Sequence, residues 1–284
     1  MEIITTIAAL RYARNSLTGS VGMVPTMGYL HRGHIALVEQ AARANDHVIV
    51  SIFVNPTQFG PTEDFASYPR DPARDLAMLQ ESRVSLVFMP TPAAMYPAGF
   101  QTSVELGEIA QGLEGSHRPG HFRGVATVVS KLFNLIQPDR AYFGQKDAQQ
   151  AAAIQRLAID LNFPIEIVVV PIQREADGLA LSSRNVYLSE SERAAAPVIY
   201  HALQAARAQF DGGERRPAAI LKTTRAMLAS EPLLNIEYIS IADVETLSEY
   251  HDDQSNGQQI TRPALLSLAV HLGKTRLIDN IVLG

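Results

Sequence analysis

Cysteine is absent from this chain of 284 residues. The protein therefore forms no disulfide bond, and a zinc site with cysteine ligands is excluded. Hydrophobic residues make up 46% of the sequence, which is enough to build a core without cross-links. We expect an ordinary globular protein that is held together by packing.

Long apolar runs and an excess of positive charge are missing as well. No apolar run approaches the roughly 18 residues that a membrane span needs. The formal net charge is −5, whereas nucleic acids are bound by basic surfaces. The first residues, MEIITTIAALRYARN, lack the sustained apolar core of a secretion signal. The sequence predicts a cytoplasmic protein that binds neither membranes nor nucleic acid.

From residue 21 to about 170, short apolar runs alternate with segments of helical period. Strands are expected at 21–25, 47–54, 84–90, 141–144 and 165–171, and helices at 33–44, 71–83, 124–137 and 147–161. Continuous β-branched runs between helices are typical of a parallel sheet that is covered on both faces. The sequence predicts an α/β fold with a Rossmann-like, doubly wound parallel sheet, whose ligand binds beyond the carboxyl ends of the strands.

The pattern changes in the last third of the chain. Helices are expected at 189–210 and 217–229, followed by strands at 235–242, 264–272 and 275–283, with a polar loop at 251–259. Helices followed by antiparallel-looking strands indicate a second, smaller α+β domain. We expect domains at residues 1–175 and 176–284.

The segment PTMGYLHRGH, residues 25–34, lies where the first of these strands gives way to a helix. Gly28 and Gly33 bracket His31 and His34. Unpaired N–H groups and the positive end of a helix dipole form an anion site at such a place. Histidines three positions apart share one side of a helical turn, so we expect both rings to point at the anion. An isolated pair would more often be one buried and one surface histidine, but the position at the first crossover favours the anion site.

Two common nucleotide motifs are absent from the sequence. Neither the dinucleotide fingerprint G-x-G-x-x-G nor the Walker pattern G-x-x-x-x-G-K-[ST] occurs. NAD chemistry and P-loop chemistry are therefore disfavoured.

Other segments carry polar groups suited to small ligands. Asn55 and Gln58 are uncharged amides at a strand's expected carboxyl end, where they can orient a small hydroxy acid; NPTQFG taken alone would indicate only a turn. In FGQKD, Lys146 is a compact cation suited to a phosphate, and Asp147 is a good N-cap. His121 and Arg123 are candidates to reach the site, and the alternative for either residue is that it caps a helix or faces solvent.

The loop DGLALSSRNVYLS joins the two expected domains. Ser182, Ser183 and Arg184 supply two hydroxyls and a guanidinium, which together can wrap a triphosphate. A hinge at this place could close over a nucleotide.

The tetrapeptide HRGH resembles the H-x-G-H signature of the nucleotidyltransferase superfamily, which the class I aminoacyl-tRNA synthetases share. The longer string VPTMGYLHRGH is similar to the pantothenate synthetase, or pantoate–β-alanine ligase, family. The resemblance covers residues 1–284, and its motifs lie between residues 21 and 190. It implies an ATP-dependent ligase that joins (R)-pantoate to β-alanine through pantoyl adenylate and releases AMP and pyrophosphate. It also implies Mg²⁺ with the ATP, a homodimer and a mobile loop at 182–184.

The resemblance also implies the site residues. Catalytic roles fall to His31, His34, Lys146 and Arg184. ATP would contact Met27, Gly28, His31, Gly33, His34, Gly144, Lys146, Asp147, Gln173, Leu181, Ser182, Ser183 and Arg184. Pantoate and β-alanine would contact Asn55, Gln58 and Gln150. No metal ligand is assigned, and Asp75 is a candidate for an indirect contribution to Mg²⁺.

The sequence departs from the family pattern at four positions, Arg32, Gln145, Ala148 and Gln173. The family usually has an acidic residue, a glutamate, an aromatic residue and an aliphatic residue there, respectively. These changes concern fine substrate contacts. The alternatives are a nucleotidyltransferase of the same superfamily with another small acceptor, a tRNA synthetase fragment, and a nucleotide-binding module without catalysis.

Overall fold

The computed structural model describes residues 1–250 and 259–284, which divide by their contacts into two compact units. The first unit comprises Met1–Gln145 and Gln150–Pro171, and the second comprises Lys146–Gln149 and Ile172–Gly284. The expected domains at 1–175 and 176–284 stay a prediction. The loop expected at 251–259 lies outside the described residues, apart from Gln259.

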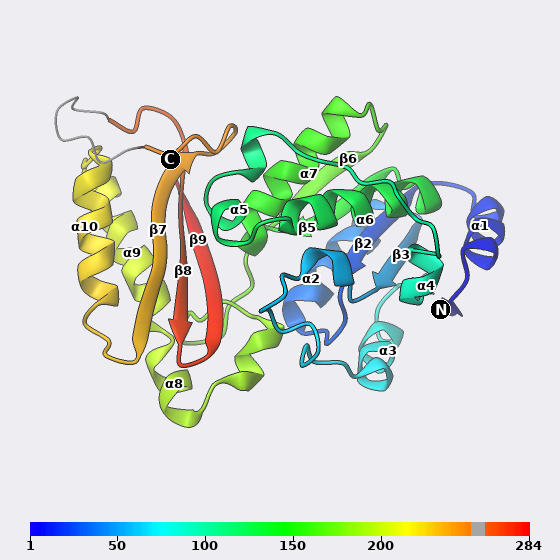
Figure 1. The fold of residues 1–284 in the computed structure, drawn as a ribbon, viewed down its shortest axis with the longest axis horizontal. Helices are drawn as coiled ribbons and strands as arrows, with labels where there is room; N and C mark the ends of the chain where they lie inside the picture. Colours follow the sequence, from blue (N-terminus) through cyan, green and yellow to red (C-terminus); the bar gives the residue numbers. More distant parts are fainter. Residues whose placement is uncertain (251–258) are drawn as a thin grey trace. The chain divides into compact units, whose positions relative to one another are not determined.

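A parallel sheet forms the centre of the first unit, with the strand order β1-β4-β3-β2-β5-β6 (Figure 1). Its strands are β1 (Glu2–Ile4), β2 (Val21–Thr26), β3 (His47–Ile52), β4 (Leu86–Phe88), β5 (Arg140–Gly144) and β6 (Glu166–Val170). The chain runs outward from β2 through β3 to β4, and then returns to β5 and β6 on the other side of β2. The strand order thus reverses between β2 and β5, and ligands of such sheets bind beyond the carboxyl ends of the strands at this place.

Helices cover both faces of this sheet. They are α1 (Ile7–Ser16), α2 (Arg32–Ala44), α3 (Pro72–Gln80), α4 (Pro92–Met95), α6 (His121–Ile136) and α7 (Ala148–Asp160). A further short helix, α5 (Glu114–His117), precedes α6. Successive strand residues point to opposite faces, so Ile49 packs against the cluster of α1, α6 and α7, whereas Val48 and Val50 pack against that of α2 and α3. The prediction of a doubly wound α/β fold is confirmed.

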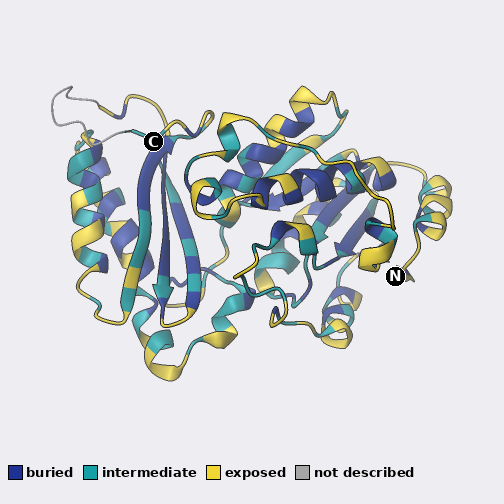
Figure 2. Cartoon of the chain, in the orientation of Figure 1, coloured by how far each residue is buried: buried dark blue, intermediate teal, exposed yellow. Residues whose placement is uncertain are grey.

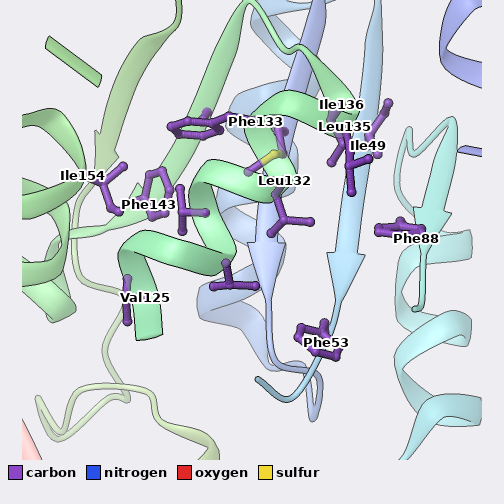
Figure 3. Packing of buried hydrophobic residues seen from close by; sticks show 14 of the residues in the cluster. Ile49, Phe53, Phe88, Val125, Leu132, Phe133, Leu135, Ile136, Phe143 and Ile154 are labelled. Carbon is purple, nitrogen blue, oxygen red and sulfur yellow. The ribbon is translucent and has the colours of Figure 1, made fainter. Parts of the chain in front are cut away.

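Helix α6 is the central helix of one face. Figure 2 shows it buried along most of its length, and Figure 3 shows side chains such as Leu132 and Ile136 lying over the sheet near Ile49. The helix begins at His121 rather than at the expected residue 124, because Gly120 adopts a left-handed conformation with φ 82° and starts it there. This earlier start brings His121 into the first turn.

The N-terminal strand β1 and helix α1 have no counterpart among the predicted elements. Strand β1 is three residues long, and a run of that length carries no period. It is recognised only by its pairing with β4, in which Ile3 lies opposite Val87.

The second unit packs helices against an antiparallel sheet of order β7-β8-β9. Its elements are α8 (Glu190–Ala195), α9 (Val198–Asp211), α10 (Pro217–Leu228), β7 (Leu234–Asp243), β8 (Ala264–Leu272) and β9 (Thr275–Leu283). The helix expected at 189–210 is divided in two around Ala196 and Pro197. The α+β character of this part of the chain is confirmed. Among the helices of the described residues, none has the length and apolar character required to cross a membrane.

Candidate active site

The turn between β2 and α2 lies at the carboxyl end of β2, beside the reversal of strand order. Gly28 and Tyr29 both have left-handed backbone conformations, with φ 82° and 49°. A Cβ atom on Gly28 would lie 3.1 Å from both Asp75 Oδ2 and Ile52 Cγ2. Glycine is therefore required at this position, for its conformation and for the close approach of Asp75.

Asp75, in α3, holds this turn by hydrogen bonds to its backbone. Its side chain is buried, at 1% exposure, and its two oxygens accept hydrogen bonds from successive backbone N–H groups. Tyr29 N donates to Oδ2 at 2.8 Å, and Leu30 N donates to Oδ1 at 2.7 Å. Burial raises the pKa of Asp75, and the two N–H groups offset only part of that rise. Because both oxygens serve the backbone, Asp75 acts on the histidine turn.

His31 and His34 hold each other in place through the backbone. Gly33 N donates to His31 Nδ1 at 3.1 Å, and His31 N donates to His34 Nδ1 at 3.3 Å. The ring centroids lie 4.0 Å apart. Since Nδ1 accepts in both rings, each neutral imidazole carries its proton on Nε2. Both residues thereby offer an Nε2–H donor of the kind that binds a phosphate oxygen.

The structure corrects the expectation of unpaired N–H groups in this turn. His31 is the N-cap of α2, with extended backbone at φ −138°, rather than a residue of its first turn. The N–H groups of Gly28, Tyr29, Leu30, His31 and Gly33 all donate to side chains of the same unit. These five groups already have acceptors, so they are not available to an anion in this conformation.

The two amides predicted to bind the hydroxy acid lie in and beside a short 3₁₀ helix after β3, η1 (Pro56–Gln58). Asn55 and Gln58 are buried, at 1% and 8% exposure. Asn55 Nδ2 donates to Gln58 Oε1 at 3.0 Å, and Gln58 Nε2 donates to Met27 Sδ at 3.2 Å. Tyr96 donates its hydroxyl proton to Asn55 Oδ1 at 2.8 Å. Met27, which immediately precedes Gly28, thus connects the amides of Asn55 and Gln58 to the histidine turn.

His121 and Arg123, whose roles the sequence left open, differ in the structure. His121 is buried, and its Nδ1 lies 2.9 Å from the carbonyl oxygen of Gln58. Arg123 has a 58% exposed side chain, which lies 3.9 Å from Glu105. Only the histidine contacts a predicted site residue.

The other predicted site residues belong to the second unit, except Gly144 and Gln150. Lys146 and Asp147 lie in the 3₁₀ turn η3 (Gln145–Asp147), and the side chain of Asn280 in β9 donates to the carbonyl oxygen of Lys146 at 2.9 Å. Asp147 is exposed.

The loop with the two serines is folded back on itself. Leu181 N donates to the carbonyl oxygen of the exposed Gln173 at 2.9 Å. Ser182 caps the 3₁₀ helix η4 (Ser183–Tyr187) by accepting from Arg184 N at 3.2 Å. Ser183 is buried, and Ser182 and Arg184 are half-buried.

A buried ion pair anchors this loop to β9. Arg174 Nη1 and Nη2 donate to the two oxygens of Asp279 at 2.6 and 2.8 Å, and Asp279 is only 2% exposed. The Arg174 guanidinium also lies 4.3 Å from the centroid of the Tyr200 ring. Asp279 and its neighbour Asn280 were not predicted. Their signal was a polar pair inside the otherwise apolar run LIDNIVL.

In the described part of the chain, residues 1–250 and 259–284, no three histidine or carboxylate side chains gather in a way that could hold a metal ion. The metal ligands that the sequence left unassigned stay unassigned.

Comparison with known proteins gives a consistent family assignment. The family model described as pantoate–β-alanine ligase matches residues 2–282. A pantothenate synthetase of Roseiflexus castenholzii is 56% identical over 283 residues, which cover 100% of this chain and 99% of the relative. The crystal structure of the pantothenate synthetase of Thermus thermophilus superposes with a TM-score of 0.92 at 49% identity, covering 99% of both chains. That of the pantoate–β-alanine ligase of Francisella tularensis, complexed with β,γ ATP and β-alanine, gives 0.81 at 36% identity, covering 99% of this chain and 97% of the other. The chain belongs to the pantoate–β-alanine ligase family.

Proposed function

We infer that the chain condenses (R)-pantoate with β-alanine at the expense of ATP and forms pantothenate, AMP and pyrophosphate. The observation that carries this conclusion is the family match, which extends over residues 2–282. A Francisella relative was crystallised with an ATP compound and β-alanine, which supports the same substrates here.

The reaction has two halves. A carboxylate oxygen of pantoate attacks the α-phosphorus of ATP, and the bond from that phosphorus to the pyrophosphate oxygen breaks. The amine of β-alanine then attacks the acyl carbon of pantoyl adenylate, AMP leaves, and the ammonium that forms loses a proton. Neither half requires a nucleophile from the protein. Catalysis consists of positioning the reactants and stabilising charge.

From the family motifs that carry them, we assign contacts with the triphosphate to His31, His34, Lys146, Ser182, Ser183 and Arg184. The two Nε2–H donors strengthen their hydrogen bonds as negative charge develops on the leaving pyrophosphate. Met27, Gly28, Gly33, Gly144, Asp147, Gln173 and Leu181 complete the proposed ATP contacts. The uncharged amides of Gln58 and Gln150 suit the hydroxy acid, because they donate and accept hydrogen bonds without a charge. Both amide hydrogens of Asn55 have acceptors in the chain, so its proposed contribution is to orient the Gln58 amide.

We propose that Mg²⁺ enters with ATP, bound to phosphate oxygens. Magnesium in such sites keeps several waters and takes few protein ligands. The described residues form no cage of their own for a metal, and both oxygens of Asp75 accept backbone N–H groups. No residue is therefore assigned as a ligand, and no step is derived through the ion. We further propose a homodimer in the cytoplasm, whose mass light scattering after gel filtration would measure.

Product analysis tests the proposed reaction. With Mg-ATP and pantoate alone, we expect enzyme-bound pantoyl adenylate and pyrophosphate; addition of β-alanine should convert the adenylate to pantothenate and AMP. Appearance of ADP and phosphate would contradict the adenylate mechanism. If no ATP is consumed with either substrate set, the inferred reaction is wrong, and nucleotide binding without turnover would favour the non-catalytic alternative.

A further inference from the structure

The first turn of α6 approaches the backbone of η1 unusually closely. A Cβ atom on Gly124 would overlap the carbonyl group of Thr57 and lie 2.7 Å from the Cα atom of Gln58, so only glycine permits this approach. Asn55 Nδ2 donates to the carbonyl oxygen of Gly124 at 3.2 Å, and His121 Nδ1 lies 2.9 Å from that of Gln58. The start of α6 therefore holds Gln58 by its backbone, while Asn55 holds its side chain.

The hydrogen-bond partners of His121 determine where its proton lies. A carbonyl oxygen only accepts, so Nδ1 donates its proton to Gln58 O. On the other side of the ring, Arg118 Nη1 lies 3.2 Å from Nε2, and a guanidinium only donates. Nε2 therefore accepts, and the ring is neutral. Burial, reinforced by the charge of Arg118, lowers the pKa of His121 to about 4, in agreement with a neutral ring at pH 7.

Arg118 is itself fixed by carboxylates. Its Nε and Nη2 donate to the two oxygens of Glu63 at 2.9 and 2.7 Å, and Nη1 lies 3.8 Å from Glu114 Oε2. Partial burial raises the pKa of Glu63, but the hydrogen bond and charge of Arg118 outweigh it, and the net shift is downward. Glu63 therefore stays ionised, Arg118 keeps its orientation, and the Nδ1–H form of His121 is favoured.

We propose that His121 is a positioning residue for the hydroxy-acid acceptor, whose neutral Nδ1–H holds the backbone of Gln58 so that the Gln58 amide meets pantoate in the correct orientation. The inference rests on the proposed role of Gln58 in binding pantoate. His121 itself does not contact the reacting atoms in this account.

Three substitutions of His121 distinguish the contribution of Nδ1 from that of Nε2. In His121→Asn, the amide nitrogen takes the place of Nδ1 and keeps the donor to Gln58. In His121→Gln, the amide lies near the place of Nε2, so the contact with Arg118 is kept and the donor to Gln58 is lost. His121→Leu removes both. His201→Gln, at an exposed histidine of α9, is the matched control.

Steady-state kinetics of these variants tests the proposal. We expect KM for pantoate to rise about tenfold in His121→Gln and His121→Leu. A tenfold change corresponds to the loss of about one hydrogen bond. It should stay within about twofold of the wild type in His121→Asn, and KM for ATP should change little in all variants. An unchanged pantoate KM in His121→Gln overturns the proposal. It is also overturned if all three variants are impaired alike, or if KM for ATP rises in parallel, since this would indicate a general structural role.

A double-mutant cycle separates this inference from the proposed function. If His121 acts through Gln58, His121→Gln should add less than about twofold to the pantoate KM of Gln58→Ala, because the two effects are coupled. Full additivity would overturn the inference. If Gln58→Ala alone leaves the pantoate KM unchanged, the proposed role of Gln58 is wrong, and the inference fails with it. If Gln58→Ala raises that KM and His121→Gln does not, only the inference fails.

Discussion

At the scale of single residues, the site is determined by side chains that accept hydrogen bonds from the backbone. Nδ1 of His31, Nδ1 of His34 and both oxygens of Asp75 accept from main-chain N–H groups of one turn. These bonds leave Nε2 as the proton-bearing nitrogen of both imidazoles. The chemistry proposed for the turn therefore depends on hydrogen bonds between side chains and the backbone of the protein.

His34→Ala is expected to slow adenylate formation in particular. The substitution removes an Nε2–H donor and also the acceptor that orients His31, so we expect a loss of roughly 10²–10³ in the rate of pyrophosphate release. Single-turnover release of pyrophosphate from ATP and pantoate measures this step. The reaction of preformed pantoyl adenylate with β-alanine should be much less affected. An unchanged rate of pyrophosphate release would show that His34 is not needed for the step.

Asp75→Asn tests the fixing of the histidine turn. The asparagine amide would place a donor against Tyr29 N or Leu30 N and leave that buried N–H without an acceptor, which costs about 1–3 kcal/mol. We expect kcat to fall roughly tenfold or more, with little change in KM for pantoate. Asp71→Asn is the matched control, because Asp71 caps α3 by accepting from Arg74 N, and asparagine caps equally well. Equal kinetics of the two variants would refute the positioning role of Asp75.

At the scale of elements, the proposed pantoate site depends on the packing of α6 against η1. Helix α6 is buried along most of its length, so it cannot shift to accommodate a larger residue at the contact. The contact leaves no room for a Cβ atom at position 124, so only glycine fits there.

Gly124→Ala is therefore expected to destabilise the protein, although alanine is the better helix former by about 1 kcal/mol. The added methyl would force η1 away from α6, at a cost of about 1–3 kcal/mol, and should raise KM for pantoate. Thermal unfolding and pantoate kinetics measure the two effects. Gly60→Ala provides the control, since a Cβ atom there meets its nearest neighbours at 3.7 Å, an ordinary contact. A more stable Gly124→Ala variant with a normal pantoate KM would mean that the close approach has no consequence.

At the scale of the whole molecule, the buried His121 couples stability to pH. Its pKa of about 4 in the folded protein lies below the ordinary value of 6.5, so between these values the unfolded chain binds a proton that the folded chain does not. The free energy of unfolding should therefore fall as the pH falls from 6.5 towards 4. The groups that face the ring are Arg118, Glu63 and Glu114.

Urea unfolding at pH 7 and pH 5 measures this contribution. Between pH 7 and pH 5, His121 should lower the free energy of unfolding of the wild type by about 2 kcal/mol. The decrease in His121→Asn should be smaller by about the same amount, because this variant lacks the titrating ring. The difference between the two proteins isolates the histidine from the other titrating groups. If the free energy of unfolding decreases equally in the two proteins, the pKa of His121 is not lowered in the folded protein.

Most of the fold was predictable because it follows from periodicity. Strands β2, β3, β5 and β6 and helices α2, α3, α6 and α7 lie within a few residues of their predicted positions, since each carries its own apolar pattern. The short helices α4 and α5 were not predicted. Strand β1 has no such pattern, because it is defined by pairing with β4 alone. The start of α6 at His121 depends on the left-handed Gly120, a conformation that the sequence permits but does not require.

The sequence by itself determined the kinds of chemical group available: histidines at a strand-to-helix turn, neutral amides after β3, and a lysine and a Ser-Ser-Arg loop for phosphate. Only the tertiary structure decided which residues hold the histidine turn and the backbone of Gln58 in place. Asp75 is 46 positions from Tyr29, and His121 is 63 positions from Gln58. No local pattern links residues so far apart, because hydrogen bonds of this kind form only after the packing of the sheet and helices has brought the partners together.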